Sequence, residues 1–298
     1  MVKLVSWNIA KRRNAWRELC NMDVDVALLQ EAGNVPDDVS GAVDEGPRAS
    51  WDPQVWNADY GNRWSSGLSE RWCKIVKLSD RVEVEWLKQV SPISMPSKDE
   101  VAVSGIGTIA VARIIPEDGL PFIAVSMWAR WMLPHTSTNS KWRIGMPDVS
   151  AHRIISDISG FVGDYDPSAH RIVAAGDLNI VYNPGGAEWD GSRDQSVWTR
   201  MAALGLEYLG PFHPNGRRAA KQREWLAPSS LNVPTYYTTY ERAPEKASQQ
   251  LDYAFASRGF HREIKVTAMN SVEEWGPSDH CRLLIEAGVS DSDTSGVA

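Results

Sequence analysis

The sequence feature that most constrains this chain is the stretch 171–181, in which an apolar run meets a polar one. Ile172–Ala175 is apolar and predicts a buried strand, and Gly176 then interrupts the run. Asp177 and Asn179 follow, with one residue between them. Side chains two positions apart on an extended chain leave on the same side, so we expect this carboxylate and this amide to point together.

A carboxylate at the end of a buried strand is costly unless it meets a metal, a proton donor or a cation. Because Gly, Asp and Asn also form turns, a plain turn is the alternative for residues 176–179. Four other places near predicted strand ends also carry polar side chains: Asn8, Glu31, Asp252, and Asp279 with His280. Taken singly, these have ordinary explanations, namely a helix cap, a solvated strand end, a surface residue and a turn. Taken together, convergent carboxylates with one histidine predict a divalent-metal phosphoryl-transfer site.

The order of the predicted elements favours two sheets packed face to face, with helices outside, in one domain over residues 1–288. Strands are predicted at 2–9, 23–29, 72–78, 82–90, 101–115, 121–128, 172–175, 250–256 and 281–286. Of these, 72–78 and 82–90 are expected to be adjacent strands, as are 101–115 and 121–128. Helices are predicted at 10–22, 148–162 and 196–205, and irregular structure at 34–71 and 129–147. Residues 289–298 predict a disordered tail.

Composition and charge limit the classes of protein that this chain can belong to. Of its 298 residues, 43% are hydrophobic and 23% are charged, which is typical of a globular chain. The formal net charge of −7 argues against tight non-specific DNA binding, although it leaves room for a local basic groove. Three cysteines without a Cys-x-x-Cys pair, and an N-terminus that predicts a strand rather than a secretory signal, favour the reducing cytoplasm. No apolar run approaches membrane-spanning length, so we expect no membrane association.

Five short motifs, in their order along the chain, resemble those of the endonuclease/exonuclease/phosphatase superfamily. The resemblance runs over residues 2–286. Its members include exonuclease III, apurinic endonucleases, pancreatic deoxyribonuclease and inositol polyphosphate phosphatases. Each motif is weak alone, but the ordered set is specific: Ser6-Trp7-Asn8, Leu29-Gln30-Glu31, Gly176-Asp177-Leu178-Asn179, Leu251-Asp252-Tyr253 and Ser278-Asp279-His280.

The resemblance implies an α+β fold, a four-layer α/β/β/α sandwich with the site at one end of the two sheets. It implies that Glu31 is the principal ligand of Mg²⁺ or Mn²⁺, with Asn8 and Asp279 completing or supporting the ligand set. It further implies that Asp177 orients and deprotonates the attacking water, and that Asn179 holds the nucleophile or a phosphate oxygen. By the same resemblance, His280, oriented by Asp252, hydrogen-bonds the scissile phosphate. The chemistry agrees, because the site must neutralise an anionic phosphodiester and hold a water in line.

The sequence departs from the family pattern at Trp128, where many members carry a histidine or tyrosine that contacts the phosphate. An indole N–H donates one hydrogen bond but cannot act as an acid at neutral pH. Either this auxiliary contact is lost, or Trp131, His135 or another loop residue makes it. The side chains predicted to bind substrate are Trp128, Arg130, Trp131 and Thr235.

The predicted activity is that of a metal-dependent nuclease, with nucleic acid as the partner and no protein partner inferred. Basic segments at 11–13, 141–143 and 217–223 are candidates to line the site, and exposed tryptophans are candidates to stack on bases: Trp51, Trp56, Trp64, Trp131 and Trp142. Solvated charges and ordinary packing explain any single one equally well. Two further hypotheses stay open: a phosphoesterase of small or lipid phosphates that uses the same metal site, and a non-catalytic binding module.

Overall fold

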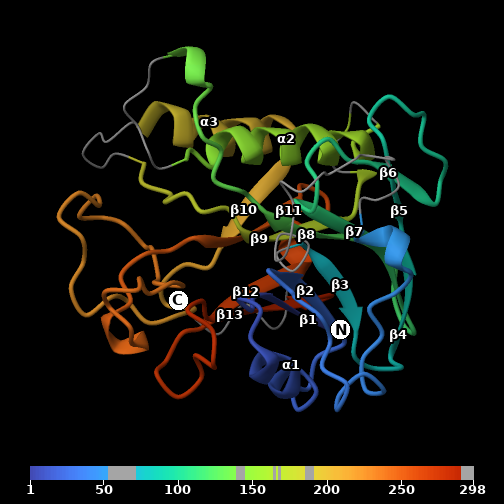
Figure 1. Cartoon of the computed structure of the whole chain (residues 1–298), viewed down its shortest axis with the longest axis horizontal. Helices are drawn as coiled ribbons and strands as arrows, with labels where there is room; N and C mark the ends of the chain where they lie inside the picture. The colour runs from blue at the N-terminus through green and yellow to red at the C-terminus, as the bar shows by residue number, and fades with distance from the viewer. Residues whose placement is uncertain (53–71, 139–144, 164–165, 167–168, 185–190, 290–298) are drawn as a thin grey trace.

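The computed structural model of the chain, shown in Figure 1, describes residues 1–52, 72–138, 145–163, 166, 169–184 and 191–289. Its centre is two large mixed β-sheets. The five-stranded sheet has the order β12 (Ile264–Met269), β13 (Arg282–Ala287), β1 (Val2–Asn8), β2 (Val26–Gln30) and β3 (Lys74–Lys77). The six-stranded sheet has the order β10 (Leu206–Gly210), β11 (Asp252–Ser257), β9 (Ile172–Asp177), β8 (Phe122–Trp128), β7 (Ile109–Pro116) and β4 (Val82–Trp86). A small parallel pair is formed by β5 (Lys88–Val90) and β6 (Glu100–Ala102).

Helices cover the outer faces of the two sheets, so the chain forms the predicted four-layer sandwich. Figure 1 shows α1 (Arg13–Leu19) on one side, and α2 (Asp148–Ile158) with α3 (Gly191–Ala203) on the other. Single turns of 3₁₀-helix occur at Arg48–Ser50, Thr136–Thr138, Ser159–Phe161, Pro244–Lys246 and His261–Glu263. Three apolar layers separate the elements: one between the sheets, one beneath α1, and one beneath α2 and α3.

The alternation of side chains along each strand explains why a polar site forms where the inter-sheet core ends. In β9, Val173 and Ala175 pack between the sheets, and Asp177, two positions further on, continues that face. In β11, Ala254 and Ala256 pack between the sheets, and Asp252 lies on the same face. The same relation holds for Asn8 in β1 and Gln30 in β2, which continue the inner faces begun by Leu4 and Leu28.

The structure corrects several predicted boundaries and one predicted pairing. Strands 72–78 and 82–90 are not adjacent, because β3 pairs with β2 in one sheet while β4 pairs with β7 in the other. Strand 82–90 divides into β4 and β5, and strand 101–115 divides into β6 and β7. The pairing of β7 with β8 is confirmed.

Helices and edge strands also differ from the predictions. Helix α1 is shorter than the predicted 10–22, since Ala10 and Lys11 have positive φ angles, which a right-handed helix excludes. Helix α3 begins five residues before the predicted start at Ser196. The edge strands β10 and β12 are not among the predicted strands.

Some predictions fall on parts of the chain that the structure does not describe. Residues 53–71, 141–143 and 290–298, with Trp56, Trp64 and Trp142, lie outside the described residues. All three cysteines are described and free. Within the described ranges, no helix has the length and apolar character needed to cross a bilayer.

Candidate active site

Three buried ionisable side chains from different segments meet at the polar end of the inter-sheet core. Nδ1 of His280 lies 2.8 Å from Oδ2 of Asp252, and its Nε2 lies 3.9 Å from Oδ2 of Asp177. Asp177 and Asp252 are directly paired in register between the antiparallel strands β9 and β11, so the two carboxylates leave the sheet side by side. The imidazole of His280 therefore lies between them.

Two amide side chains hold the carboxylate of Asp177 in place. Nδ2 of Asn8 donates to Oδ2 of Asp177 at 2.9 Å, which connects the two sheets at the site. The backbone N–H of Asn179 donates to Oδ1 of Asp177 at 2.8 Å, and its Nδ2 donates to Oδ2 at 3.0 Å. The sequence predicted that the side chains of Asp177 and Asn179 point together, and this hydrogen bond joins them.

The hydrogen bonds of Asn179 occupy its whole side-chain amide. Besides Asp177, its Nδ2 donates to the backbone oxygen of Ala129 at 3.1 Å, and its Oδ1 accepts the indole N–H of Trp131 at 3.0 Å. In this arrangement Asn179 positions Asp177, and its amide hydrogens have no further capacity to hold a nucleophile.

Hydrogen bonds hold residues 278–280 against β1, so the last of the five motifs lies beside the first. The hydroxyl of Ser278 donates to the backbone oxygen of Asn8 at 2.6 Å. The indole N–H of Trp7 donates to the backbone oxygen of His280 at 2.9 Å. Ser278 and Trp7 therefore set the position of the imidazole although neither side chain contacts its ring nitrogens.

Strained backbone is concentrated at the same strand ends. Ala10, Lys11, Glu31 and Asn179 have φ angles of 46°, 59°, 45° and 53°. The chain holds these left-handed conformations with hydrogen bonds such as Ala10 N–H to Oδ1 of Asn8 and Lys11 N–H to the backbone oxygen of Glu31. Residues without glycine's freedom adopt such angles at a cost of about 1–3 kcal/mol each, and they gather at functional sites.

Burial and mutual charge control protonation in this cluster. Burial raises the pKa of Asp177 and the charge of Asp252 adds to this rise, although the charge of His280 opposes it. Burial lowers the pKa of His280, but the carboxylates of Asp252 and Asp177 outweigh burial and raise it overall. The imidazole is thus stabilised as a cation, a form in which both ring nitrogens donate hydrogen bonds.

The predicted metal ligands adjoin this cluster: Asn8 is hydrogen-bonded to Asp177, and Asp279 directly precedes His280. Asn8 is aligned with Gln30 in the parallel pair β1–β2, so Glu31 follows directly beyond it. Glu31 and Asp279 are half-buried, and their charges add to the effect of burial in raising the pKa of Tyr236. The donor set consists of two carboxylates and one amide oxygen, which are the oxygen ligands that hard divalent cations prefer. These residues therefore fit Mg²⁺ or Mn²⁺.

The four side chains predicted to bind substrate lie in different environments. Thr235 is fully buried, and its hydroxyl accepts the backbone N–H groups of Leu251 and Asp252, so it supports Asp252 rather than facing a substrate. Trp128 is only 5% exposed and packs in the inter-sheet core. Its indole N–H is enclosed, with no hydrogen-bond partner among the described residues. These two placements disagree with the predicted substrate contacts.

Arg130 and Trp131 lie nearer the surface. The guanidinium carbon of Arg130 is 5.8 Å from the ring centroid of Trp128. Trp131 is 51% exposed, and its N–H is bound to Asn179. Trp131 thus presents an aromatic surface next to the residue that holds Asp177.

Tyr236 was not among the predicted site residues, yet its ring lies 4.8 Å from that of His280, centroid to centroid. Tyr236 forms an isolated β-bridge with His280, which is distant in sequence. The only local signal was its position beside the predicted site residue Thr235. No periodicity or spacing within residues 234–238 indicates a pairing that depends on the fold.

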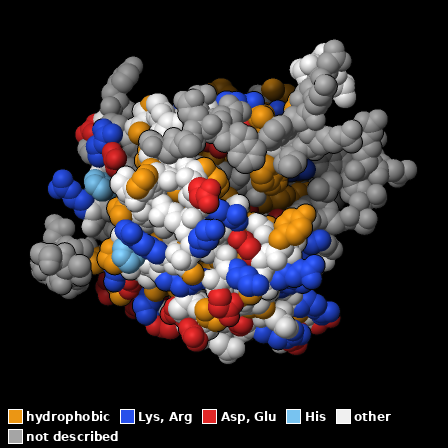
Figure 2. All heavy atoms as spheres, turned by 90° about the vertical axis from the view of Figure 1, so that its left-hand side faces the viewer, with side chains coloured by type: hydrophobic (Ala, Val, Ile, Leu, Met, Phe, Trp, Pro, Cys, Tyr) orange, Lys and Arg blue, Asp and Glu red, His pale blue; other side chains and the backbone are white. Residues whose placement is uncertain are grey.

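The predicted basic segment 217–223 is partly committed to holding loops together. Arg217 donates to the backbone oxygens of Asn270 and Pro244, and Arg223 donates to Ser248 and Glu241. The loops of residues 211–249, orange at the left of Figure 1, face the viewer in Figure 2. On that face Lys and Arg side chains are interspersed with Asp and Glu rather than gathered into one basic stripe.

Comparison with known proteins defines the class of this protein. The sequence model of the Endonuclease/Exonuclease/phosphatase family matches residues 5–280. No curated protein sequence matches the chain. The chain therefore belongs to the endonuclease/exonuclease/phosphatase family. Since this family consists of hydrolases of phosphoric ester bonds, the protein is an enzyme of that class.

Several solved structures have the same fold as this chain. The AP endonuclease LMAP from Leishmania major is 16% identical with a TM-score of 0.59, over 97% of this chain and 88% of that one. The endonuclease domain of TRAS1, a telomere-specific non-LTR retrotransposon, is 15% identical with a TM-score of 0.56, over 98% and 100%. The 3′ phosphatase NExo from Neisseria, bound to a product DNA hairpin, is 13% identical with a TM-score of 0.51, over 96% and 99%. At these identities the likeness is one of fold.

Proposed function

We propose that this chain is a divalent-metal-dependent phosphodiesterase that hydrolyses the phosphodiester bonds of DNA or RNA. The observation that carries the proposal is a series of contacts at one end of both sheets: Asn8 hydrogen-bonds Asp177, Asp177 lies 3.9 Å from the imidazole of His280, and that imidazole is hydrogen-bonded to Asp252. A buried imidazole between two carboxylates is suited to bind an anion and to stabilise the charge that develops on it.

In the proposed reaction, Asp177 orients the attacking water and takes its proton. Asn8 and Asn179 fix its carboxylate, so the water that it binds is held for attack from one direction. Asp252 holds Nδ1 of His280, which leaves Nε2–H to hydrogen-bond a phosphate oxygen. General-base catalysis of this kind typically contributes about 10²–10⁴-fold to the rate.

Glu31, Asn8 and Asp279 would hold the divalent ion, for which we propose Mg²⁺ or Mn²⁺. A bound ion of this kind supplies Lewis-acid stabilisation of the phosphate charge, worth several kcal/mol. The half-buried positions of Glu31 and Asp279 keep these oxygens accessible, whereas Asp177 and Asp252 are almost fully enclosed.

Trp131 supports a nucleic acid as the substrate. Its ring is half exposed, and its N–H is bound to Asn179 next to Asp177. A base beside the scissile phosphate can stack on this ring, and such stacking is worth about 1–3 kcal/mol per base. The DNA-bound neighbour of the same fold is consistent with this substrate class.

A phosphoesterase of small or lipid phosphates is the second candidate. It is favoured by the net charge of −7 and by the mixed charges on the face shown in Figure 2. A long polyanion gains little from such a surface outside the site itself.

The two candidates are separated by assaying the protein with Mg²⁺ on labelled single- and double-stranded oligonucleotides and on a panel of phosphomonoesters and small diesters. The nuclease proposal expects oligonucleotide cleavage that stops on chelation of the metal. Turnover of the small esters with inert oligonucleotides would favour the second candidate, and no turnover of any substrate would reject both. Asp177→Asn is expected to be inactive, whereas Asp80→Asn, on a fully exposed side chain, is expected to match the parent.

A further inference from the structure

The segment 235–237 is held between the strand that carries Asp252 and the segment that carries His280. Tyr236 forms isolated bridges to both Gln249 and His280. The backbone N–H of Tyr236 donates to Gln249 at 3.0 Å, and that of Tyr237 donates to Asp279 at 3.0 Å. The backbone of Tyr236 is therefore fixed by the same residues that fix the catalytic imidazole.

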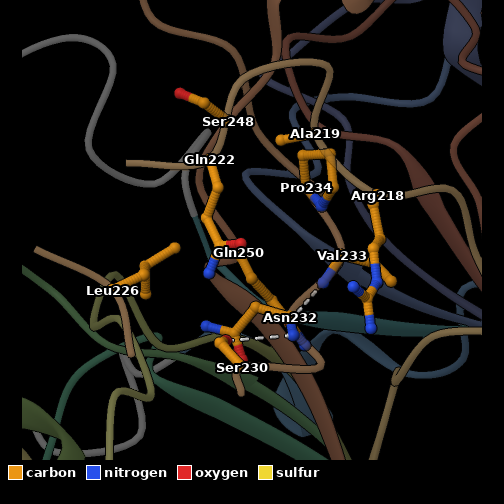
Figure 3. A pocket seen from close by; sticks show the side chains of 10 residues that line it. All are labelled: Arg218, Ala219, Gln222, Leu226, Ser230, Asn232, Val233, Pro234, Ser248 and Gln250. Atoms are coloured by element: carbon orange, nitrogen blue, oxygen red, sulfur yellow. Dashed lines mark hydrogen bonds between the residues drawn. The ribbon is translucent and has the colours of Figure 1, made fainter. Parts of the chain in front are cut away.

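A buried glutamine anchors this segment from behind. Oε1 of Gln250 accepts the backbone N–H of Val233 at 2.9 Å, and its Nε2 donates to the backbone oxygen of Pro211 at 2.9 Å. Figure 3 shows Gln250 in a small cavity of about 50 Å³ with the hydrogen bond to Val233 drawn. The chain that leads into Tyr236 is thus held by a buried side chain.

The side chain of Tyr236 lies at the catalytic cluster with its hydroxyl uncommitted. Its ring contacts that of His280 at a centroid distance of 4.8 Å and an interplanar angle of 44°. The ring is half-buried, and within the described part of the chain the hydroxyl has no hydrogen-bond partner. Burial, together with the charges of Asp279, Asp177, Glu241 and Glu31, raises the pKa of Tyr236 to about 12. The phenol therefore keeps its proton throughout the neutral range.

The other polar aromatic and amide donors near Asp177 are already used or enclosed. The N–H of Trp131 is bound to Asn179, and both amide hydrogens of Asn179 are bound to Asp177 and Ala129. The N–H of Trp128 is enclosed in the inter-sheet core. Of these donors, the phenol of Tyr236 is the one placed against the imidazole and still able to donate.

We infer that Tyr236 is a catalytic residue, which donates its phenolic hydrogen to a non-bridging oxygen of the scissile phosphate beside His280. This inference rests on the proposed phosphodiesterase function. No proton is transferred, because the phenol acts only as a hydrogen-bond donor to the anion. Such a donor strengthens its hydrogen bond as negative charge accumulates on the phosphate oxygens in the transition state.

The test compares Tyr236→Phe with Tyr237→Phe, which removes the hydroxyl of the adjacent tyrosine that packs on Trp275. Whichever substrate the parent turns over is used for both variants. Tyr236→Phe is expected to lower kcat by about 10²-fold with little change in KM, since the lost contact acts mainly in the transition state. Tyr237→Phe is expected to keep the parental kcat.

A second measurement separates a lost donor from a disturbed fold. Replacing Tyr236 by 3,5-difluorotyrosine keeps the ring but makes the phenol more acidic, so the donor is lost as pH rises. At high pH, kcat is expected to begin its fall at a lower pH in the difluorotyrosine protein than in the parent. A parental kcat in Tyr236→Phe, or an unmoved alkaline limb, would overturn the role of Tyr236 while leaving the function intact. An inactive parent would instead refute the function.

Discussion

At the scale of single residues, the site is the point where an apolar face becomes polar. Asp177 and Asp252 continue the inner faces of strands whose preceding residues pack between the sheets. The alternation of side chains is readable in sequence, and for that reason these two residues were predictable. Tyr236 was not, because its placement depends on bridges to Gln249 and His280 that only the folded chain creates.

The pairing of Asp252 with His280 predicts a large effect for a small change. Asp252→Asn removes the charge that holds Nδ1 of the imidazole, so the ring loses its orientation and its stabilised cation. We expect kcat to fall by about 10²–10⁴-fold, measured on the substrate that the parent cleaves. The pKa of His280, followed by NMR, is expected to fall as well, because Asp252 is the carboxylate that raises it most.

The matched control is Asp80→Asn, a change at a fully exposed carboxylate that pairs with Lys77. It is expected to leave both kcat and the pKa of His280 at the parental values. An Asp252→Asn protein with parental kcat would show that the imidazole needs no carboxylate partner.

At the scale of elements, the central strands of the two large sheets were predictable, as were the edge strands β3 and β4, whereas the edge strands β10 and β12 were not. Buried strands such as β1, β2, β8 and β9 consist of apolar runs, and their side chains give a clear signal. The chain passes from one sheet to the other between β3 and β4, and a short polar turn looks the same whether it closes a hairpin or a crossing. The edge strands β10 and β12 have mixed exposure and so lack a continuous pattern.

Gly176 is required because β8 and β9 approach closely at this residue, which directly precedes Asp177. A Cβ at this position would lie 1.9 Å from the backbone oxygen of Met127, and the φ angle is +156°. We expect Gly176→Ala to lower the free energy of unfolding by at least about 2 kcal/mol and to displace Asp177, which reduces activity. Urea denaturation measures the first effect.

Gly163→Ala serves as the control, because a Cβ there would have no atom within 4 Å. It is expected to leave the unfolding midpoint unchanged. Equal stability of the two variants would mean that β8 can withdraw from β9 without cost.

Asp157 in helix α2 is expected to make the stability of the fold depend on pH, independently of the candidate active site. Asp157 accepts the backbone N–H of Ser104, and burial raises its pKa. A raised folded pKa means that its contribution to stability is full below the unfolded value of about 3.9 and is lost as pH rises through the folded pKa. Asp157→Asn cannot lose a proton, so it keeps this contribution and is expected to exceed the parent in stability near neutral pH.

The measurement is urea denaturation of both proteins at about pH 4.5 and about pH 7.5. The advantage of Asp157→Asn is expected to be larger at the higher pH. Groups elsewhere titrate equally in both proteins and cancel in the difference. A difference that does not change with pH would contradict the stated cause of the shift.

At the scale of the whole molecule, the five-stranded sheet is assembled from the two ends of the chain, with β1, β2 and β3 from one end and β12 and β13 from the other. The six-stranded sheet takes all its strands from the part of the chain between β3 and β12. This arrangement brings Asn8, Glu31, Asp177, Asp252 and His280 to one end. The order of motifs predicted the fold through its resemblance to a family. No local sequence pattern indicates that the two sheets pack against each other.

The central claim is that this end of the molecule holds a divalent cation against a phosphate. The most direct test is the rate of substrate cleavage as a function of Mn²⁺ concentration, for the parent and for Glu31→Gln. We expect Glu31→Gln, although folded, to need far more Mn²⁺ or to lose about 10²-fold in its maximal rate. A variant with the parental Mn²⁺ dependence and the parental maximal rate would contradict it.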